Sequence, residues 1–386
     1  MRLYRLGESR QRQEILAKLG VDKGGVAIMA EKMETLWILI RDLRTPGANI
    51  LKQDALSIGA DLAVPSGVIT CETERVDALL IATRAQLRRL IRKASAQPFG
   101  LKKLAKALRG FLREEQGPAR IMGVLNANDD SFYAGSRFLG DEAMNRIDAM
   151  IKEGAAIIDI GAVSSRPGAA EVSVQEELRR IRPLCEEIGK RRLFERALFS
   201  IDSYTPEVVD YALRSGFGLI NDITGASDER LIDLAVEHDA DYCIMHMQGT
   251  PQTMQRAPRY EDVTAEVDAF FDERIARCEA RGLPREKILL DVGIGFGKSL
   301  EHNLTLLRNH RTFLRHGCEL LIGASRKSMI DRIIPTPTEK RLPGTLAIHL
   351  KAVENGATVV RCHDVAEHRQ ALAVWEAMAD VSSDKA

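Results

Sequence analysis

The chain has 386 residues, enough for one large domain with a smaller one beside it, or for two domains. Its formal net charge is zero and 45% of its residues are hydrophobic, so no overall charge draws it to nucleic acid or to a membrane. No apolar run reaches the ~20 residues that span a bilayer, and the start "MRLYRLGESRQRQ" lacks the apolar core of a signal peptide. The six cysteines show no C-x-x-C spacing, which indicates free thiols in a reducing compartment. We therefore expect a cytoplasmic protein.

Residues 1–115 are expected to form an N-terminal mixed α/β extension of unknown role. Within it, "GADLAVPSGVI" (59–69) predicts two strands around a turn at 65–67. Residues 84–113 hold ten Lys or Arg and no acidic residue, and their leucines recur at helical steps on both sides of a break at 98–100. This predicts a pair of basic amphipathic helices. Because no aromatic residues suited to base stacking are interleaved, a solvated basic face is favoured over a nucleic-acid or membrane contact.

Residues 116–386 alternate strand-like and helix-like segments eight times. The predicted strands are nearly continuous apolar runs, typical of parallel strands covered on both faces, and they lie within 120–126, 155–163, 198–202, 218–222, 241–247, 288–293, 319–325 and 358–364. Helical spacing covers 141–154, and further helices are expected to begin near Val174, Pro206, Glu229, Tyr260, Leu300, Thr345 and Val365. Eight such pairs predict a closed (β/α)8 TIM barrel, an α/β fold. The rival, an open doubly wound sheet, needs a Gly-rich turn after its first strand, which is missing.

Polar residues follow every predicted strand, where a barrel of this kind carries its active site. One polar residue at a strand end is commonly a satisfied core or capping residue, but eight strand ends together indicate a polar rim. The rim comprises Asn126; Ser164, Ser165 and Arg166; Asp202; Asn221 and Asp222; His246 and Gln248; Asp291; Ser325, Arg326 and Lys327; and Arg361 and His363.

The residue types on this rim indicate a pocket for a flat heterocycle. Asp202, Asn221 and Asp291 offer acceptors and a donor that suit a 2-amino-4-oxo pyrimidine ring. Lys327 is placed to meet a ring carbonyl or nitrogen from another side. No Ser-His-Asp or Cys-His order stands out, so a protein nucleophile is not favoured.

The last strand adds an anion site beside the heterocycle pocket. Arg361 and His363 alternate with Cys362, so the two bases share one face as a fork and Cys362 packs on the other. The alternative is a strand end that simply meets water. Asn126 offers a hard oxygen ligand for Mg²⁺, which completes its shell with phosphate oxygens and water. Since there is no P-loop, a departing pyrophosphate is favoured over nucleotide hydrolysis.

Residues from about 120 to the C-terminus resemble dihydropteroate synthases. The resemblance rests on "IMGVLNANDDSF", "GAAIIDIGAVSSRPGA", "FSIDSYTPEV", "LINDITG", "MHMQGTPQTM", "ILLDVGIGFGKSLEHN", "GASRKS" and "VVRCHDV", in the family's order. It implies a TIM barrel that joins two small-molecule substrates, 6-hydroxymethyl-7,8-dihydropterin diphosphate and p-aminobenzoate, into 7,8-dihydropteroate with release of pyrophosphate. It also implies Mg²⁺, a homodimer, and competition by sulfonamides. It does not extend over residues 1–115.

The resemblance implies a role for each matching position. The pterin-binding positions are Asp202, Asn221, Asp291 and Lys327, and the diphosphate-binding positions are Asn126, Arg166, Arg361 and His363, with Asn126 also the Mg²⁺ ligand. The p-aminobenzoate pocket comprises Ser165, Pro167, Phe296 and Ser328, together with Arg166 and Lys327. The catalytic residues are Lys327, Arg361, His363 and Asp130, the last on a first loop that closes over the pocket.

Three loop positions depart from the family pattern. Residues 128–132 read Asn-Asp-Asp-Ser-Phe where Thr-Pro-Asp-Ser-Phe is usual, and loss of the proline frees the backbone. Ser165 replaces Thr, and Val292 replaces Pro. Two other hypotheses stay open: a pterin-binding methyltransferase barrel, which has no need of the Ser-Arg-Lys or Arg-x-His segments, and a non-catalytic pterin binder, which the altered first loop motivates.

Overall fold

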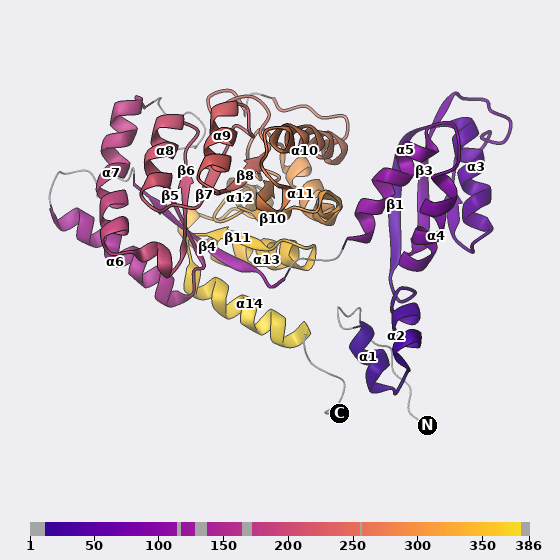
Figure 1. The fold of residues 1–386 in the computed structure, drawn as a ribbon, viewed down its shortest axis with the longest axis horizontal. Coiled ribbons are helices and arrows are strands. Elements are labelled where there is room, and N and C mark those ends of the chain that lie inside the picture. The colour runs from indigo at the N-terminus through magenta and orange to yellow at the C-terminus, as the bar shows by residue number, and fades with distance from the viewer. Residues whose placement is uncertain (1–11, 114–116, 128–136, 164–171, 255–256, 380–386) are drawn as a thin grey trace. The chain divides into compact units, whose positions relative to one another are not determined.

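The computed structural model describes residues 12–113, 117–127, 137–163, 172–254 and 257–379. The chain separates into two compact units, residues 115–374 and residues 1–114 with 375–386 (Figure 1). Among the described residues, no helix has both the length and the apolar character needed to cross a bilayer.

Residues 115–374 form a closed barrel of eight parallel strands, so the predicted (β/α)8 fold is confirmed. The strand order is β10-β11-β4-β5-β6-β7-β8-β9, closed by pairing of β9 with β10. The strands are β4 (Arg120–Asn126), β5 (Ile157–Gly161), β6 (Leu198–Asp202), β7 (Leu219–Asp222), β8 (Asp241–Met245), β9 (Ile288–Asp291), β10 (Glu319–Ile322) and β11 (Val359–Cys362). All eight lie inside the predicted ranges.

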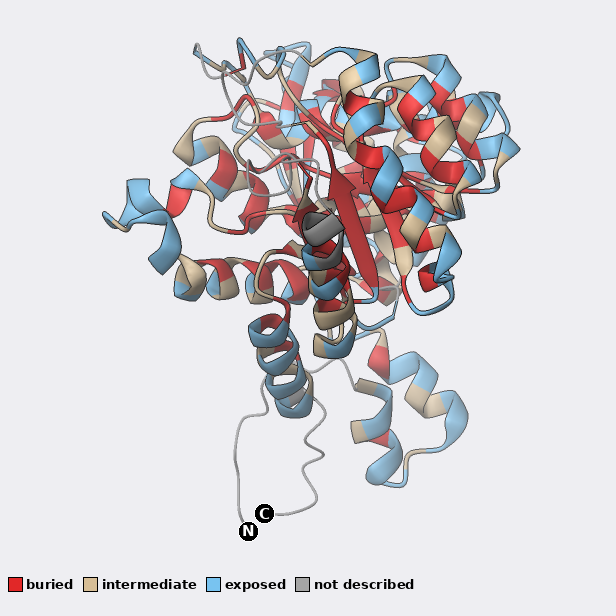
Figure 2. Cartoon of the chain, turned by 90° about the vertical axis from the view of Figure 1, so that its left-hand side faces the viewer, coloured by how far each residue is buried: buried red, intermediate tan, exposed pale blue. Residues whose placement is uncertain are grey.

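Helices cover the outside of the barrel, and the strands between them are almost entirely buried (Figure 2). They are α6 (Arg137–Glu153), α7 (Val174–Lys190), α8 (Pro206–Arg214), α9 (Glu229–Glu237), α10 (Val263–Ala280), α11 (Leu300–Arg308), α12 (Ser328–Ile333), α13 (Leu342–Glu354) and α14 (Val365–Ala379). Local sequence sets several of the starts. Ser173, Asp262 and Ser299 cap the backbone N–H groups of α7, α10 and α11. The short helix α12 was not predicted.

Alternation along the strands separates an apolar plug from a polar mouth inside the barrel. One cluster of buried residues fills the interior: Met122, Ile157, Leu219, Cys243, Leu289, Leu321 and Val359. Because side chains alternate along a strand, residues two positions further on face the same way. For four of these strands the next inward residue is Asp159, Asn221, Asp291 or Arg361. The polar layer therefore rests directly on the apolar one.

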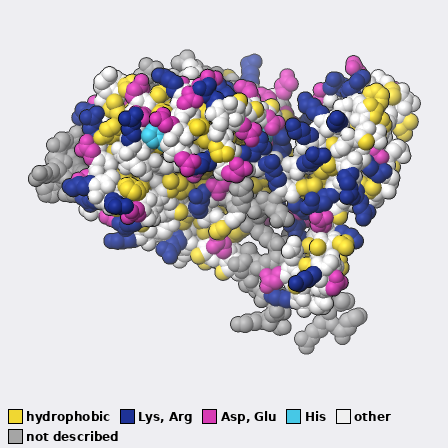
Figure 3. All heavy atoms as spheres, viewed as in Figure 1, with side chains coloured by type: hydrophobic (Ala, Val, Ile, Leu, Met, Phe, Trp, Pro, Cys, Tyr) yellow, Lys and Arg dark blue, Asp and Glu magenta, His cyan; other side chains and the backbone are white. Residues whose placement is uncertain are grey.

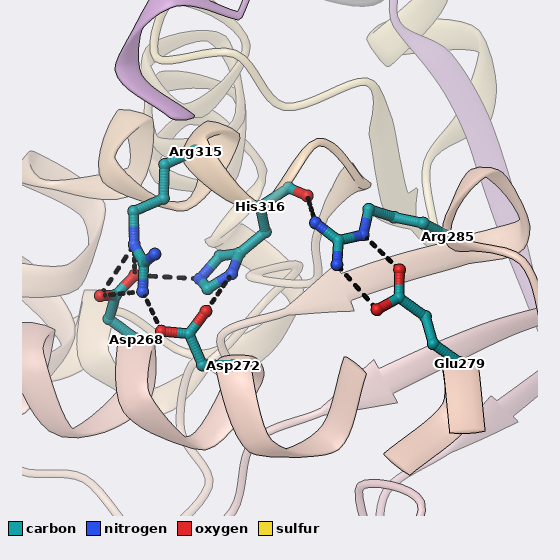
Figure 4. Close-up of polar contacts among 6 residues, drawn as sticks. All are labelled: Asp268, Asp272, Glu279, Arg285, Arg315 and His316. Carbon is teal, nitrogen blue, oxygen red and sulfur yellow. Dashed lines mark hydrogen bonds and ion pairs between the residues drawn. The ribbon is translucent and has the colours of Figure 1, made fainter. Parts of the chain in front are cut away.

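An ionic cluster away from the mouth anchors the segment before β10 (Figure 4). Arg315 Nε lies 2.7 Å from Asp268 Oδ1, and the buried ring of His316 bonds Asp268 at 2.9 Å and contacts Asp272 at 3.3 Å. Arg285 donates to the His316 carbonyl at 3.0 Å. These charges all have partners within the cluster, which indicates a structural role, the fixing of 310–316 against α10.

The N-terminal unit is a small α/β domain around a three-stranded antiparallel sheet of order β1-β3-β2. Its elements are α1 (Arg12–Lys18), α2 (Lys23–Ala30), β1 (Thr35–Arg44), α3 (Thr45–Leu56), β2 (Asp61–Ala63), β3 (Arg75–Thr83), α4 (Arg84–Ala94) and α5 (Leu101–Leu108). The mixed α/β character is as predicted, but the second strand expected within 59–69 is absent. Residues after β2 form turns, in which Thr70 Oγ1 donates to the Gly67 carbonyl at 2.9 Å.

Helices α4 and α5 are the predicted basic amphipathic pair. Their apolar faces join the core of this unit through Leu87, Leu90, Leu101 and Leu108. Their basic residues are exposed, apart from the buried Arg84, and Figure 3 shows Lys and Arg side chains spread over the visible face of the unit. The structure thus shows the basic face that the sequence predicts.

Candidate active site

Arg361 is the centre of a buried ionic network in the barrel mouth. Its guanidinium Nε donates to Asp159 Oδ2 at 2.7 Å, and Nη2 donates to Asp202 Oδ2 at 2.7 Å. Asp159 also accepts from Ser200 Oγ at 2.6 Å and from Asn221 Nδ2 at 3.1 Å. One arginine on β11 therefore fixes carboxylates on β5 and β6, and through Asp159 an amide on β7.

Burial governs the protonation of this network. It raises the pKa of Asp202 to about 7, because desolvation and the nearby Asp159 outweigh the attraction of Arg361. Burial also disfavours the charge on Arg361, but Asp159 and Asp202 overcome that effect and raise its pKa. Arg361 is therefore a permanent cation, while Asp202 is poised to exchange a proton near neutral pH.

Asp291 and Lys327 lie on the other side of the mouth. The Asp291 carboxylate accepts from the Gly293 N–H at 2.8 Å; burial raises its pKa, an effect opposed by this hydrogen bond and by Lys327 and Arg361. Lys327 Nζ lies 4.2 Å from the ring centroid of Phe296, a cation–π distance. A carboxylate and an ammonium group therefore lie close together in this part of the mouth.

The turn after β9 packs backbone against backbone on the loop after β8. An added Cβ at Gly293 would lie 2.0 Å from the His246 carbonyl oxygen, and one at Gly297 would lie 2.5 Å from that of Gln248. Both glycines also have positive φ, at 66° and 62°. This wall of the mouth therefore requires residues without side chains.

Lys298 fastens the same two loops from inside, with 1% of its surface exposed. Its Nζ contacts His246 Nδ1 at 3.0 Å, the His246 carbonyl at 3.2 Å and the Phe296 carbonyl at 2.9 Å, so three acceptors match its three protons. Burial lowers its pKa to about 7, against the pull of Asp291.

His363 is held by the neighbouring loop. Its backbone N–H donates to Ser325 Oγ at 3.3 Å, and the same hydroxyl lies 2.9 Å from His363 Nδ1. Burial and the charge of Arg361 lower the pKa of His363 to about 4, so the ring is neutral near pH 7.

The structure brings most of the predicted site residues to one mouth. They are Asp202, Asn221 and Arg361 in the ionic network, Asp291, Lys327 and Phe296 beside it, and His363. Asn126 ends β4, where its backbone pairs with Gly161 of β5, and Ser328 is exposed at the start of α12. Two rim residues fold loops instead: Asp222 accepts from Thr224, Ala226 and Tyr242, and Gln248 bonds the backbone of Arg259. Asp130, Ser165, Arg166 and Pro167 lie outside the described residues.

Sequence reasoning missed Asp159 and Lys298. Each is a charged residue that the fold buries completely or nearly so. The available signal was a lone carboxylate inside the apolar run "AAIIDIGAV", because a buried charge is costly unless it is paired. No comparable signal marked Lys298, which sits in a glycine-rich loop.

Residues that could hold a metal are sparse. In the described part of the chain, no group of three or more His, Cys, Asp or Glu side chains is arranged to bind a metal ion. The oxygen of Asn126 at the rim fits Mg²⁺ only as one ligand among several, with the rest coming from a phosphate-bearing substrate and water.

Comparison with known proteins places this geometry in context. Residues 122–363 match the family described as pterin binding enzyme. A dihydropteroate synthase of Escherichia coli is 45% identical over 266 residues, 69% of this chain and 93% of that protein. A bifunctional dihydropteroate synthase/dihydropteroate reductase of Helicobacter pylori is 38% identical over 364 residues, 94% of this chain and 95% of that protein. The second match takes in the N-terminal unit.

Solved structures agree. The Yersinia pestis dihydropteroate synthase with a sulfonamide drug complex has a TM-score of 0.64 and 36% identity, and covers 70% of this chain and 99% of its own. The Xanthomonas albilineans dihydropteroate synthase in complex with 7,8-dihydropteroate has a TM-score of 0.60 and 33% identity, and covers 69% of this chain and 94% of its own.

Proposed function

Because the chain belongs to the dihydropteroate synthases, a family of pterin-binding enzymes, we propose that its barrel joins a 6-hydroxymethyl-7,8-dihydropterin diphosphate to p-aminobenzoate. The observation that carries the proposal is the mouth itself, where acidic and amide groups for a pterin adjoin the cations Arg361 and Lys327. The products are 7,8-dihydropteroate and pyrophosphate.

Asp202, Asn221, Asp291 and Lys327 form the proposed pterin site. The carboxylates accept from the ring N–H and amino groups, while the amide and the ammonium donate to ring oxygen or nitrogen. A ligand without these groups would leave buried polar atoms unpaired, so the site discriminates strongly.

The p-aminobenzoate site is assigned to Phe296, Lys327 and Ser328, with Ser165, Arg166 and Pro167 contributed by the second loop. Phe296 gives an aromatic wall, and Lys327 beside it gives a positive charge for the carboxylate. A sulfonamide resembles p-aminobenzoate in shape and charge, so we propose that it competes here.

The diphosphate site is assigned to Asn126, Arg166, Arg361 and His363. His363 offers its imidazole ring, held by Ser325, and Arg361 adds a fixed charge. We propose Mg²⁺ as the cofactor, bound through Asn126 and the diphosphate; when bound, it neutralises charge on the leaving group.

In the proposed reaction, the bond between the pterin methylene carbon and the diphosphate oxygen breaks, and pyrophosphate leaves with the electron pair. The amine nitrogen of p-aminobenzoate then bonds that carbon and loses one proton. The chain's contribution is position and electrostatics: Asp202 and Asp291 stabilise positive charge on the ring, while Arg361 and His363 stabilise the departing anion. Asp130, on the first loop, is also assigned a catalytic role.

We further propose a cytoplasmic homodimer, as the family resemblance implies. The six cysteines are free, which fits a reducing compartment.

A second candidate activity is reduction of dihydropteroate. It is favoured by the match to the bifunctional Helicobacter pylori protein, which runs through the N-terminal unit as well as the barrel. Such a step adds two electrons and two protons across a ring C=N bond, so it needs a nicotinamide or flavin donor. Incubating the purified chain with 7,8-dihydropteroate and each donor tests it, and no consumption with any donor would remove it.

The synthase assay follows pyrophosphate release from the pterin diphosphate with p-aminobenzoate and Mg²⁺. We expect release that depends on both substrates, and its loss in Asp291→Asn. Tight pterin binding without release would instead support a non-catalytic binder, and methyl transfer to a corrinoid would support a methyltransferase.

A further inference from the structure

The loops after β10 and β11 are joined at the mouth. These strands are neighbours in the barrel, so the loop bearing Lys327 runs beside the end of β11, with Arg361, and the loop after it, with His363. Ser325 bonds His363, and Arg326 Nε pairs with Asp364 Oδ2 at 3.1 Å. These two ties connect side chains on the inner part of the loops.

A third tie lies behind the loops and uses two histidines with no role in the proposed reaction. The Ala324 N–H donates to His349 Nε2 at 3.0 Å, His349 Nδ1 lies 2.8 Å from His368 Nε2, and His368 Nδ1 lies 2.6 Å from the Asp364 carbonyl. Both rings are 1% exposed. They come from α13 and α14, so the chain of bonds runs from one loop through two helices to the other loop.

The ends of this chain decide where its protons are. A backbone N–H can only donate and a backbone carbonyl can only accept. His349 Nε2 therefore accepts and its Nδ1 carries the proton, and His368 likewise accepts at Nε2 and carries a proton on Nδ1. Either ring, once protonated, would have two donors and lose an acceptor. Burial, which disfavours the charged form and lowers the pKa of both rings, supports the neutral pair.

We propose that His349 and His368 are positioning residues that hold the loop of Lys327 in register with the loop after β11, which bears His363 and adjoins Arg361 at the end of that strand. The inference rests on the proposed function, which assigns Lys327 on the first loop to the pterin and His363 on the second loop to the diphosphate. Loss of the histidine pair would misplace the anion site relative to the pterin site. It should therefore weaken binding of a pterin that carries a diphosphate more than binding of a pterin without one.

The first test needs no activity. In the wild-type chain with ¹⁵N-labelled histidine, NMR should show His349 and His368 protonated at Nδ1. A proton on Nε2 of His349 or His368 overturns the inference, whether or not the enzyme turns over.

The second test measures binding of the pterin diphosphate and of 6-hydroxymethyl-7,8-dihydropterin. His349→Leu should weaken the diphosphate ligand at least tenfold and the plain pterin less than threefold, while His349→Gln, which keeps an acceptor and a donor, should recover most of the difference. His310→Leu, at another fully buried histidine, is the matched control and should leave both affinities unchanged.

Equal losses for both ligands, or none, overturn the positioning role. If His349→Leu does not fold, the NMR result on the wild type decides. A wild-type chain that binds neither ligand defeats the proposed function instead, and leaves the proton assignment standing.

Discussion

Replacing Arg361 with methionine would remove the charge at the centre of the mouth while keeping most of the side-chain volume. Asp159 and Asp202, which it contacts at 2.7 Å, would then lack their cation. Breaking a buried ion pair costs about 3–5 kcal/mol, because the remaining charge is uncompensated. Asp202 can escape by taking a proton, since its pKa is already about 7. Asp159 is fully buried and would stay without its cation. We therefore expect Arg361→Met to lower the free energy of unfolding by about 3–4 kcal/mol.

Calorimetry is the appropriate assay. The two tryptophans are Trp37, in the N-terminal unit, and Trp375, near the end of α14, so fluorescence does not follow the barrel alone. Arg281→Met is the matched control: Arg281 also pairs with two carboxylates, but at the surface, and its loss should matter far less.

A double variant isolates the cause. Adding Asp159→Asn to Arg361→Met removes the unpaired buried charge and keeps an acceptor for Asn221. The double variant should therefore be more stable than the single variant by about 1 kcal/mol or more. If Arg361→Met stays within about 1 kcal/mol of wild type, or if the double variant is no better, the network is not what holds the mouth together.

Three further results are expected. The free energy of unfolding, and Tm with it, should fall as the pH drops from 6.5 to about 4. The fall in free energy is up to about 1.4 kcal/mol per pH unit for each histidine, because the unfolded chain binds protons that the folded chain does not. Burial lowers the folded pKa values of His246, His310 and His363 to about 3, 4 and 4. Asp202, Asp241 and Asp291, whose pKa values are raised, act in the opposite sense, but the histidines with lowered pKa values, which include His349 and His368, outnumber them. A flat Tm contradicts the assignment. Lys298→Met should raise KM for p-aminobenzoate about tenfold, equivalent to about 1.4 kcal/mol, because it removes the hydrogen bond that holds the Phe296 carbonyl. Unchanged kinetics would show that Lys298 does not position Phe296 for this substrate. Gly297→Ala should cost about 1–3 kcal/mol in calorimetry, whereas Gly117→Ala, also at positive φ but in open space, should cost less.

The barrel was predictable because its strands are short, nearly continuous apolar runs, each with a polar residue at or just after its C-terminal end. "LFSID" is an example, since it coincides with β6 and places Asp202 at the mouth. The inward direction of the site residues also follows from the two-residue alternation that connects them to the apolar plug.

What could not be predicted depends on contacts between distant elements. Asp159 looked like part of an apolar strand, and only the approach of β11 across the mouth gives it Arg361 as a partner. His349 and His368 look like ordinary helix residues until α13 and α14 bring them together. In the N-terminal unit, local bonds such as Thr70 to Gly67 closed a turn where alternation favoured a strand.

The glycine turn after β9 also limits how this enzyme can change. Gly293 and Gly297 stand against carbonyl oxygens of the neighbouring loop, so almost any replacement would push the loops apart. A bound molecule that rests on main-chain atoms there meets a surface that point mutation can hardly reshape. Adaptation to a new inhibitor would therefore have to arise at positions that still have a side chain to exchange.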